Sequence, residues 1–319
     1  MAKPTIANVA ELAGVSQATV SRALRGATNV TEETRIKVQR AADQLNFTLS
    51  KSASALASGK TMRVILLVSG KLNEWFNSGV LQGVYEELAP VGYDVTPAFI
   101  TDRSELDRFF SQLPKSRNAD AIIISSFQLM PAMRDQLQAI DLPTVGVNVP
   151  AESGYFDASI SIDNSSAMTM AVRLLRSLGH TNIAFCSDYI PADMVYNTSQ
   201  RTQAFADAAQ ANATDGITFS LLTADAHDAP LSKSDLASQL TAKLLSLPER
   251  PTAVCVETDQ VAIALVKELR KQQLNVPEDI SVLGFDDAEI AQAADLSTIR
   301  QEPIELGRIA GRKSAAAPT

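Results

Sequence analysis

From Met62 onward, short apolar runs rich in β-branched residues alternate with longer stretches that have helical spacing. The first series of runs is RVILLVS, DVTPAFI, DAIIISS and TVGVNV, with helical stretches near 78–89, 104–113 and 130–140. After SISID, the second series is NIAFCS, TFSLLTA, AVCVE and ISVLGF, with helical stretches near 164–178, 199–211, 234–247 and 260–272. This alternation predicts parallel sheets whose two faces are covered by helices. Two series predict two doubly wound α/β lobes.

The ligand site of such a body is predicted in the cleft between its lobes, because open α/β sheets bind ligands beyond the carboxyl ends of their strands. No GxGxxG or Walker glycine loop follows any of the strand-like runs, so we expect no nucleotide cofactor. The chain has two histidines, His180 and His227, and no clustered metal ligands, which argues against a zinc site. Cys186 and Cys255 stand in separate apolar runs, and we interpret them as buried reduced thiols.

Residues 10–24, AELAGVSQATVSRAL, predict a helix-turn-helix unit near the start of the chain. Thr5 is placed to cap a first helix, and Gly14 can leave that helix in a left-handed conformation. Ser16 is placed to cap the second helix, and Thr31 to cap a third. The second helix turns a polar face outward, which carries Gln17, Ala18, Ser21 and Arg22. The pattern is typical of DNA-binding heads, although a small helical bundle without DNA contacts has the same spacing.

The charge distribution favours contact with nucleic acid by the head alone. Residues 1–60 contain eight Lys or Arg against four Asp or Glu, whereas residues 61–319 contain 20 against 32. The head therefore has a net charge of +4 and the rest −12, within a total of −8. A basic head suits contact with DNA phosphates. No apolar segment is long enough to span a bilayer, and the first residues lack the apolar core of a signal peptide, so we expect a cytoplasmic protein.

Residues 47–61, FTLSKSASALASGKT, shift in composition to Ser, Ala, Lys and Gly, and are predicted to link the two parts. We therefore expect three regions: a head over 1–46, a hinge over 47–61 and a body over 62–319. Within the body, we expect lobe one over about 62–160 and 291–312, and lobe two over about 161–290.

Eight phrases carry a family resemblance: TIANVAELAGVSQATVSRAL, NVTEETRIKVQRAADQLNF, SASALASGK, VGYDV, SIDN, LGHTNIAF, VPEDISVLGFDD and STIRQEPIELG. Together they resemble the lactose repressor/galactose repressor family of bacterial transcription regulators. The resemblance implies a homodimeric regulator, a repressor rather than an enzyme, whose heads bind operator DNA. It also implies that the body binds a small effector, a sugar or sugar phosphate, in its cleft, with no cofactor, metal or membrane involved.

The resemblance assigns base contacts to the second helix. Gln17 and Ala18 open this recognition helix, and Arg22 lies one turn further along. Gln can read adenine, Arg can read guanine, and Ala offers a methyl contact to thymine. The positions matched to phosphate contacts, which set register without reading sequence, are Thr5, Ser16, Thr19, Ser21 and Asn29.

Two hinge residues, Ala53 and Leu56, match family positions in a helix that forms on DNA. In that arrangement a pair of leucines wedges into a minor-groove base step. The family commonly enters the hinge through aromatic-x-Pro-Asn, whereas this chain reads Phe47-Thr48-Leu49-Ser50. Without the proline, we expect a less rigid entry, and a flexible tether is the alternative interpretation.

Five residues match effector-contact positions of the family: Trp75, Phe76, Asp163, Arg201 and Asp286. Asn197, one turn before Arg201, is a further candidate. Carboxylates and a guanidinium can bracket vicinal hydroxyls, while an aromatic ring stacks on the apolar side of a sugar. The aromatic pair could instead be lobe-packing core, and either aspartate could be a helix cap. Thr258 stands where relatives often carry Asn. His227 lies near a family aromatic position, where a solvated loop histidine is the simpler interpretation.

Other functions stay open on the sequence. A nucleobase or a phosphorylated metabolite could replace the sugar as effector. A secreted sugar-binding protein would share the two lobes, but the head and the missing signal peptide argue against it. A glycosidase could use Asp163 and Asp286 as acid and nucleophile, but no nucleophile–base pair, metal or cofactor loop supports catalysis.

The C-terminal region departs from the family. A helix is expected from near Pro303 to about Arg312, and the following KSAAAPT has no strand pattern. Relatives continue with a strand that returns to lobe two. We therefore expect lobe two to lack its last strand and to leave a bare sheet edge.

Overall fold

The computed structural model describes residues 4–24, 26–27, 29–47, 60–116, 118–140, 142–149, 156–190, 197–226 and 231–316. They form a helical head and a larger α/β body, which are described in turn. The hinge positions Ala53 and Leu56 and the loop residue His227 lie outside the described residues. None of the described helices is long and apolar enough to cross a membrane.

Three helices form the head: α1 (Ile6–Ala13), α2 (Gln17–Leu24) and α3 (Glu32–Gln44). Gly14 ends α1 in the left-handed region at φ 65°, as predicted, and this conformation disfavours a side chain. The backbone N–H of Thr19 donates to Ser16 Oγ at 3.1 Å, so Ser16 caps α2 as predicted. One buried valine from each helix joins a shared core: Val9, Val20 and Val38.

The other two predicted caps of the head are also present. Thr5 forms a capping box with Asn8, in which the Thr5 backbone N–H and hydroxyl donate to Asn8 Oδ1 at 3.0 and 2.7 Å. Thr31 Oγ1 accepts from the backbone N–H of Thr34 at 3.4 Å, at the start of α3. These local bonds fix where the helices begin, and hence where the outer face of α2 lies.

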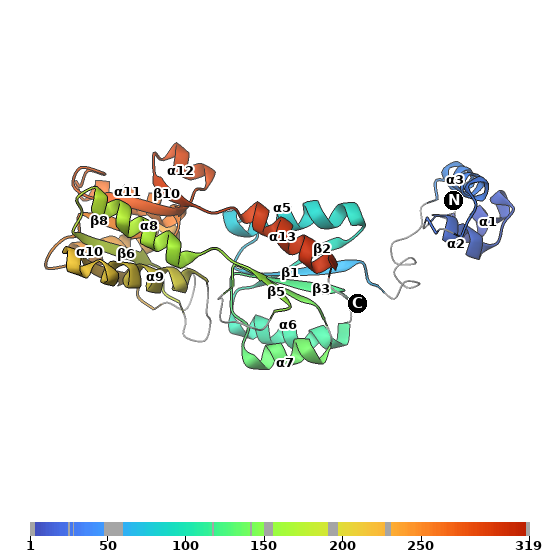
Figure 1. The fold of residues 1–319 in the computed structure, drawn as a ribbon, viewed down its shortest axis with the longest axis horizontal. Helices are drawn as coiled ribbons and strands as arrows, with labels where there is room; N and C mark the ends of the chain where they lie inside the picture. Colours follow the sequence, from blue (N-terminus) through green and yellow to red (C-terminus); the bar gives the residue numbers. More distant parts are fainter. Residues whose placement is uncertain are drawn as a thin grey trace. The chain divides into compact units, whose positions relative to one another are not determined.

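Lobe one is built on a five-stranded parallel sheet in the order β2-β1-β3-β4-β5 (Figure 1). Its strands are β1 (Arg63–Ser69), β2 (Asp94–Ile100), β3 (Ala121–Ser125), β4 (Thr144–Val147) and β5 (Ala158–Ile160). Its helices are α5 (Trp75–Leu88), the 3-10 turn η1 (Ala89–Val91), α6 (Arg103–Ser116) and α7 (Pro131–Ala139). The central strands are buried nearly throughout, because α5 covers one face while α6 and α7 cover the other (Figure 1).

Lobe two repeats the architecture with the sheet order β10-β9-β8-β6-β7. Its strands are β6 (Asn182–Ser187), β7 (Thr218–Thr223), β8 (Ala253–Val256), β9 (Ser281–Asp286) and β10 (Ser297–Arg300). Its helices are α8 (Asn164–Ser177), α9 (Asn197–Ala211), the 3-10 turn η2 (Ala213–Asp215), α10 (Lys233–Leu245), α11 (Asp259–Lys271) and α12 (Glu289–Ala293). One core lies between the sheet and α8 with α9, and another between the sheet and α10 with α11. The predicted pair of doubly wound lobes is therefore confirmed.

The last helix, α13 (Pro303–Ala316), lies along α5 in lobe one (Figure 1). Two glycines allow the helix backbones to touch. A Cβ added at Gly83 would overlap the carbonyl oxygen of Ile304, and one added at Gly307 would overlap that of Val80. The seam between α5 and α13 therefore depends on the absence of side chains at these two positions.

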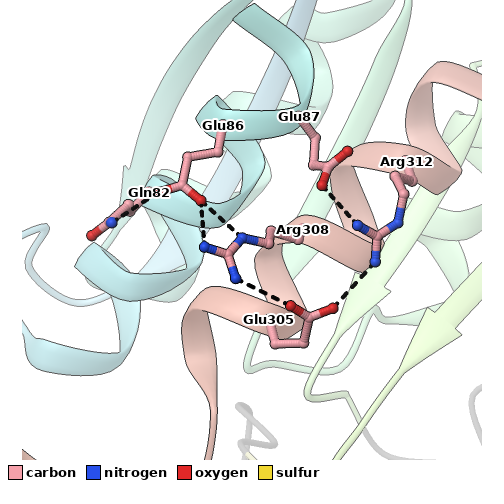
Figure 2. A network of polar contacts seen from close by, with 6 residues as sticks. All are labelled: Gln82, Glu86, Glu87, Glu305, Arg308 and Arg312. Atoms are coloured by element: carbon pink, nitrogen blue, oxygen red, sulfur yellow. Dashed lines mark hydrogen bonds and ion pairs between the residues drawn. The ribbon is translucent and has the colours of Figure 1, made fainter.

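Charged side chains border the same seam on its outer side, as Figure 2 shows. Arg308 pairs with Glu86 at 2.8 Å and Arg312 pairs with Glu87 at 2.7 Å, which connects α13 to α5. Both guanidinium groups also contact Glu305. Because these groups are partly exposed, each pair contributes about 1 kcal/mol or less, and the glycine contact dominates the packing.

The chain returns to lobe one later in the sequence than predicted. β10 pairs in parallel with β9, so it and the preceding α12 belong to lobe two, and the boundary follows Arg300 rather than residue 291. The strand gives no sequence signal because Ile299 alone of its four residues is apolar. Within the described residues, β9 is the only strand next to β10, which therefore lies at the edge of the sheet. The helix α13 extends past its predicted end near Arg312.

The two thiols are free and buried, as predicted. Cys186 packs toward α10 and α11, whereas Cys255 packs toward α8 and α9, so they lie on opposite faces of the sheet. Burial raises the pKa of Cys255 to about 12 and raises that of Cys186 as well. Both groups are therefore protonated, unreactive core residues.

Candidate functional site

The outer face of α2 carries the side chains that the resemblance matches to base contacts. Gln17, Ala18 and Arg22 are exposed, and Arg22 Nε donates to the Ala18 carbonyl oxygen at 3.2 Å. The residues matched to phosphate contacts are exposed or half-buried: Thr5, Ser16, Thr19, Ser21 and Asn29. The head therefore presents a polar helix face of the kind that meets base edges and phosphates.

A cleft lies between the two lobes of the body, with an empty volume of about 800 Å³ when open solvent is included. Lobe one contributes residues that follow β1, β3 and β4. Lobe two contributes residues at the starts of α9, α10 and α11 and at the end of β9. These are the strand ends at which open α/β sheets place ligand sites. The predicted effector residues that line the cleft are Trp75, Phe76, Asn197, Arg201 and Asp286.

Arg201, in the second turn of α9, is a buried cation of this cleft, with 3% of its surface exposed. Its Nη1 donates to the Glu257 carbonyl oxygen at 2.5 Å and lies 3.8 Å from Asp286 Oδ1. The guanidinium carbon lies 3.8 Å from the centroid of the Phe285 ring, and this cation–π contact helps to hold the guanidinium in place. Among the described residues, nothing accepts a hydrogen bond from the Arg201 Nε, so this N–H is available to a ligand.

Asp286 ends β9 inside the cleft and is 8% exposed. Gln301 Nε2 donates to its Oδ1 at 2.5 Å, and its φ of 135° is one that residues with a side chain rarely adopt. Burial raises the pKa of Asp286 to about 7, although Arg201 opposes the rise. The folded protein thus holds this proton more tightly than the unfolded chain. The group's contribution to stability is consequently lost as the pH rises from about 4 to about 7.

Two further buried carboxyl groups surround Arg201. Glu257 and Asp259 are 5% and 0% exposed, and burial raises the pKa of both, that of Glu257 to about 7. Asp259 accepts from the Ala288 backbone N–H at 2.9 Å and from the Thr298 hydroxyl at 2.5 Å, so it ties the end of β9 to β10. Three buried carboxyl groups therefore share one buried guanidinium.

The lobe-one side of the cleft begins at the N-terminus of α5. Trp75 and Phe76 are half-buried and both line the cleft. Phe76 also packs against the core of lobe one, so for this residue the core-packing interpretation and the lining position both hold. Asn77 Nδ2 donates to the Ser69 and Lys71 carbonyl oxygens at 2.8 and 3.0 Å, which fixes the loop between β1 and the aromatic pair.

One backbone hydrogen bond at the cleft joins the two lobes directly: the Asn197 backbone N–H donates to the Ser126 carbonyl oxygen at 3.1 Å. Within lobe two, Asn164 Nδ2 donates to Asn197 Oδ1 at 3.1 Å and so holds the Asn197 side chain. Ser126 and Asn148, at the ends of β3 and β4, have φ values of 72° and 53°. Such strained backbone in residues other than glycine is concentrated at binding sites in proteins.

Asp163 does not line the cleft. It is exposed, and its carboxylate accepts from the Ser166 backbone N–H at 2.9 Å and from the Ser166 hydroxyl at 2.6 Å. It caps α8, which is the alternative that the sequence left open. The pair of facing carboxylates that a glycosidase would need from Asp163 and Asp286 is therefore not formed in the cleft.

Sequence reasoning missed most of the polar side chains that line the cleft: Ser69, Glu74, Asn77, Ser126, Asn148, Thr198, Lys233, Gln260 and Gln301. They are single residues at strand ends or helix starts, and that placement is the one signal that could have found them. Thr258 lines the cleft as well, and no residue in the described part of the chain is a hydrogen-bond partner of its buried hydroxyl. In the part of the chain that the structure describes, no three His, Cys, Asp or Glu side chains are grouped as metal ligands.

These features define a class of protein: transcription regulators with a helix-turn-helix head and a two-lobed binding body. The family model for bacterial regulatory proteins of the lacI family matches residues 5–50, and that for the periplasmic binding protein-like domain matches residues 172–316. The HTH-type transcriptional repressor PurR of Vibrio cholerae serotype O1 is 30% identical, over 95% of this chain and 88% of that protein.

Solved structures give the same result for the fold. The lac repressor dimer bound to operator and the anti-inducer ONPF has a TM-score of 0.82 at 23% identity, over 98% of this chain and 92% of that one. The complex of the transcriptional regulator CelR with cellobiose has a TM-score of 0.66 at 26% identity, with the same coverage. The chain belongs to the lacI family of bacterial regulatory proteins and is a DNA-binding transcriptional repressor of that family.

Proposed function

We propose that this repressor binds operator DNA through α2 as a homodimer and responds to a small carbohydrate in the interlobe cleft. The observation that carries the proposal is Arg201, a buried guanidinium beside the Asp286 carboxyl group, whose Nε has no hydrogen-bond partner among the described residues. Such a fork of donors beside an acceptor can bracket two neighbouring hydroxyls of a sugar. The half-buried ring of Trp75 supplies a face for the apolar side of the ring. CelR, which binds cellobiose, is a relative with the same architecture.

The head supports the DNA-binding part of the proposal. Gln17 and Arg22 are exposed five residues apart on α2, where they can reach base edges in a major groove. The net charge of +4 over residues 1–60 suits the phosphate backbone. Ala53 and Leu56 are proposed as minor-groove contacts from the family resemblance, and both lie outside the described residues.

Exposed apolar side chains support the homodimer. Tyr85 and Val91 are 60% and 57% exposed at the end of α5 and in η1, and Phe99 is exposed on the edge strand β2. A second copy would remove these side chains from water. Sedimentation velocity on the full chain tests this part, with a two-chain species expected at micromolar concentration and a monomer contradicting it.

The effector part is tested by a melting screen of the full chain against sugars and nucleobases. A ligand that binds the folded protein raises its melting temperature by mass action. We expect a sugar to raise it and also to change the retention of operator DNA in a gel shift. A nucleobase is the second candidate, because two neighbouring aromatic side chains, Trp75 and Phe76, line the cleft and can stack on a flat ring.

A further inference from the structure

One carboxylate holds the chain at the point where the predicted hinge enters the body. Asp120 directly precedes β3, and Thr61 and Met62 are the two residues before β1. The Thr61 backbone N–H and hydroxyl donate to Asp120 Oδ1 at 2.7 and 2.9 Å. The Met62 backbone N–H donates to Asp120 Oδ2 at 2.9 Å. Both oxygens of the carboxylate therefore bind successive residues of one segment.

The backbone at Met62 turns as the chain enters β1. Its φ of 54° lies in the left-handed region, which residues with a side chain seldom adopt. Charge-assisted hydrogen bonds from two successive N–H groups to Asp120 hold the chain in this turn. β1 is paired without them, because Val64 lies in register with β2 on one side and with β3 on the other. Asp120 therefore fixes the direction in which the hinge meets the body.

A second pair in lobe one has the same chemistry at a different position. Asp157 Oδ2 accepts from the backbone N–H and the hydroxyl of Thr144 at 2.7 and 3.0 Å. Thr144 begins β4 and Asp157 directly precedes β5, so this pair also joins neighbouring strands. Of the two pairs, only that of Asp120 includes a residue of the predicted hinge. Asp157 is therefore a matched control, which joins strands without touching the hinge.

The length of the hinge makes its point of attachment important. Residues 48–59 separate the described part of the head from that of the body. A segment of this length spans about 20 Å as a flexible coil and at most about 40 Å when fully extended. Over such a distance, the position and direction of the attached end decide which positions the head can reach. A fixed end raises the effective concentration of one head at its half-site once the other head is bound.

We infer that Asp120 is a positioning residue for operator binding, which acts by fixing Thr61 and Met62 at the body end of the hinge. The inference rests on the proposed function, in which the two heads of a homodimer bind one operator. A carboxylate is repelled by DNA phosphates, so the role of Asp120 is placement and not contact. Placement matters for DNA that holds both heads at once, and it does not matter for a single half-site.

The test uses the full chain with two DNA duplexes. One is an operator that wild type selects from a random duplex library, and the other carries one half of that operator. Asp120→Asn turns one carboxylate oxygen into an NH2 group, which cannot accept from a backbone N–H. We expect this variant to bind the full operator at least about fivefold more weakly than wild type and to bind the half-site equally well. Asp157→Asn should bind both duplexes as wild type does.

Two measurements report on the variants themselves. Hydrogen–deuterium exchange at the Thr61 and Met62 amides should be faster in Asp120→Asn than in wild type and unchanged in Asp157→Asn. Trp75 is the single tryptophan of the chain and lines the cleft, so its fluorescence reports occupancy of the cleft directly. Titration of Trp75 with a sugar found in the melting screen should give the wild-type midpoint in both variants, which shows that the body is intact.

A milder pair of variants tests the same contact if Asp120→Asn does not fold. Thr61→Val removes the hydroxyl bond to Asp120 and leaves the two backbone bonds in place, whereas Thr61→Ser keeps all three. Thr61→Val should bind the full operator more weakly than wild type, and Thr61→Ser should bind it as wild type does. Equal operator affinity in Thr61→Val and Thr61→Ser would count against the inference.

The outcomes separate the inference from the proposed function. Asp120 is assigned to the stability of lobe one alone if Asp120→Asn and Asp157→Asn lose operator affinity equally. The same assignment follows if Asp120→Asn loses as much affinity for the half-site as for the full operator. Operator binding of wild-type strength by Asp120→Asn, despite faster amide exchange, also overturns the inference. A wild-type chain that selects no two-part operator overturns the proposed homodimeric function, and the inference with it.

Discussion

Replacing Arg201 separates two roles of one buried guanidinium, in stability and in effector binding. Arg201→Ala removes the hydrogen bond to the Glu257 carbonyl oxygen, the stacking on Phe285 and the cation beside Asp286. Arg201→Lys retains a cation that can reach the same carbonyl oxygen, but it loses the planar fork and the free Nε. Comparing the two variants therefore distinguishes loss of charge from loss of the fork.

The expected magnitudes follow from these contacts. An unsatisfied buried carbonyl costs about 1–3 kcal/mol. The lost cation–π contact costs about 0.5–2 kcal/mol. The Asp286 carboxyl, whose pKa is already about 7, takes up a proton rather than remaining as an isolated charge, which limits the additional penalty. We expect the free energy of unfolding to fall by about 2–4 kcal/mol in Arg201→Ala and by about 1 kcal/mol in Arg201→Lys.

Both variants should lose effector affinity to a similar extent, because neither has the fork of donors. A hydrogen bond to a charged group contributes about 1.5–3 kcal/mol, which corresponds to about 10- to 150-fold weaker binding. Urea unfolding measures the stability difference, and titration of Trp75 fluorescence with the sugar that binds wild type measures affinity. Sugar binding of wild-type strength by Arg201→Lys, or an unchanged unfolding midpoint in Arg201→Ala, would refute this reasoning.

Three other changes test separate parts of the molecule. Asp286→Asn removes a carboxyl whose pKa is raised to about 7, so the free energy of unfolding of this variant should decline less than that of wild type between about pH 5 and pH 7. Urea unfolding at several pH values measures this, and an identical dependence on pH in both proteins would contradict the raised pKa. Gly83→Ala should lower the free energy of unfolding by at least about 2 kcal/mol, because the new Cβ overlaps the backbone of α13. The control Gly179→Ala, which has open space at φ 90°, should cost about 1 kcal/mol, and equal losses would argue against a tight seam. Gln17→Ala and Arg22→Ala should each weaken binding to a selected operator by about 1–3 kcal/mol, while binding to scrambled DNA is retained. Gel shifts that show an equal loss on operator and on scrambled DNA would assign the two side chains to phosphate contacts.

Most of the fold could be predicted because its elements are long and periodic. AIIIS in β3 is apolar along almost its whole length and is fully buried, as a central parallel strand should be. β10 could not be predicted, since its pairing with β9 rests on backbone bonds and a single apolar residue, Ile299. α12 has five residues, too few to establish a helical period.

The cleft was less predictable than the sheets. Arg201 and Asp286 could be found through their match to a family, and both lie in the cleft. Ser126 and Asn148 line it with positive φ angles, which no local signal announces in residues other than glycine. Asp163 matched the same family positions but caps α8, because Ser166 offers two donors within the first turn. A carboxylate suits a cap and a sugar site equally, and only the tertiary structure decides between them.

If the cleft is the effector site of a repressor, its occupancy must change the affinity of the protein for operator DNA. Anisotropy of a labelled operator would be measured with the full chain at increasing concentrations of the sugar that alters Trp75 fluorescence. We expect the operator dissociation constant to change by about tenfold or more, with the same midpoint as the Trp75 titration, because coupling between two sites is reciprocal. In Arg201→Lys both curves should shift to higher sugar concentration together. A sugar that saturates the Trp75 signal but leaves the operator dissociation constant unchanged would show that the cleft does not control DNA binding.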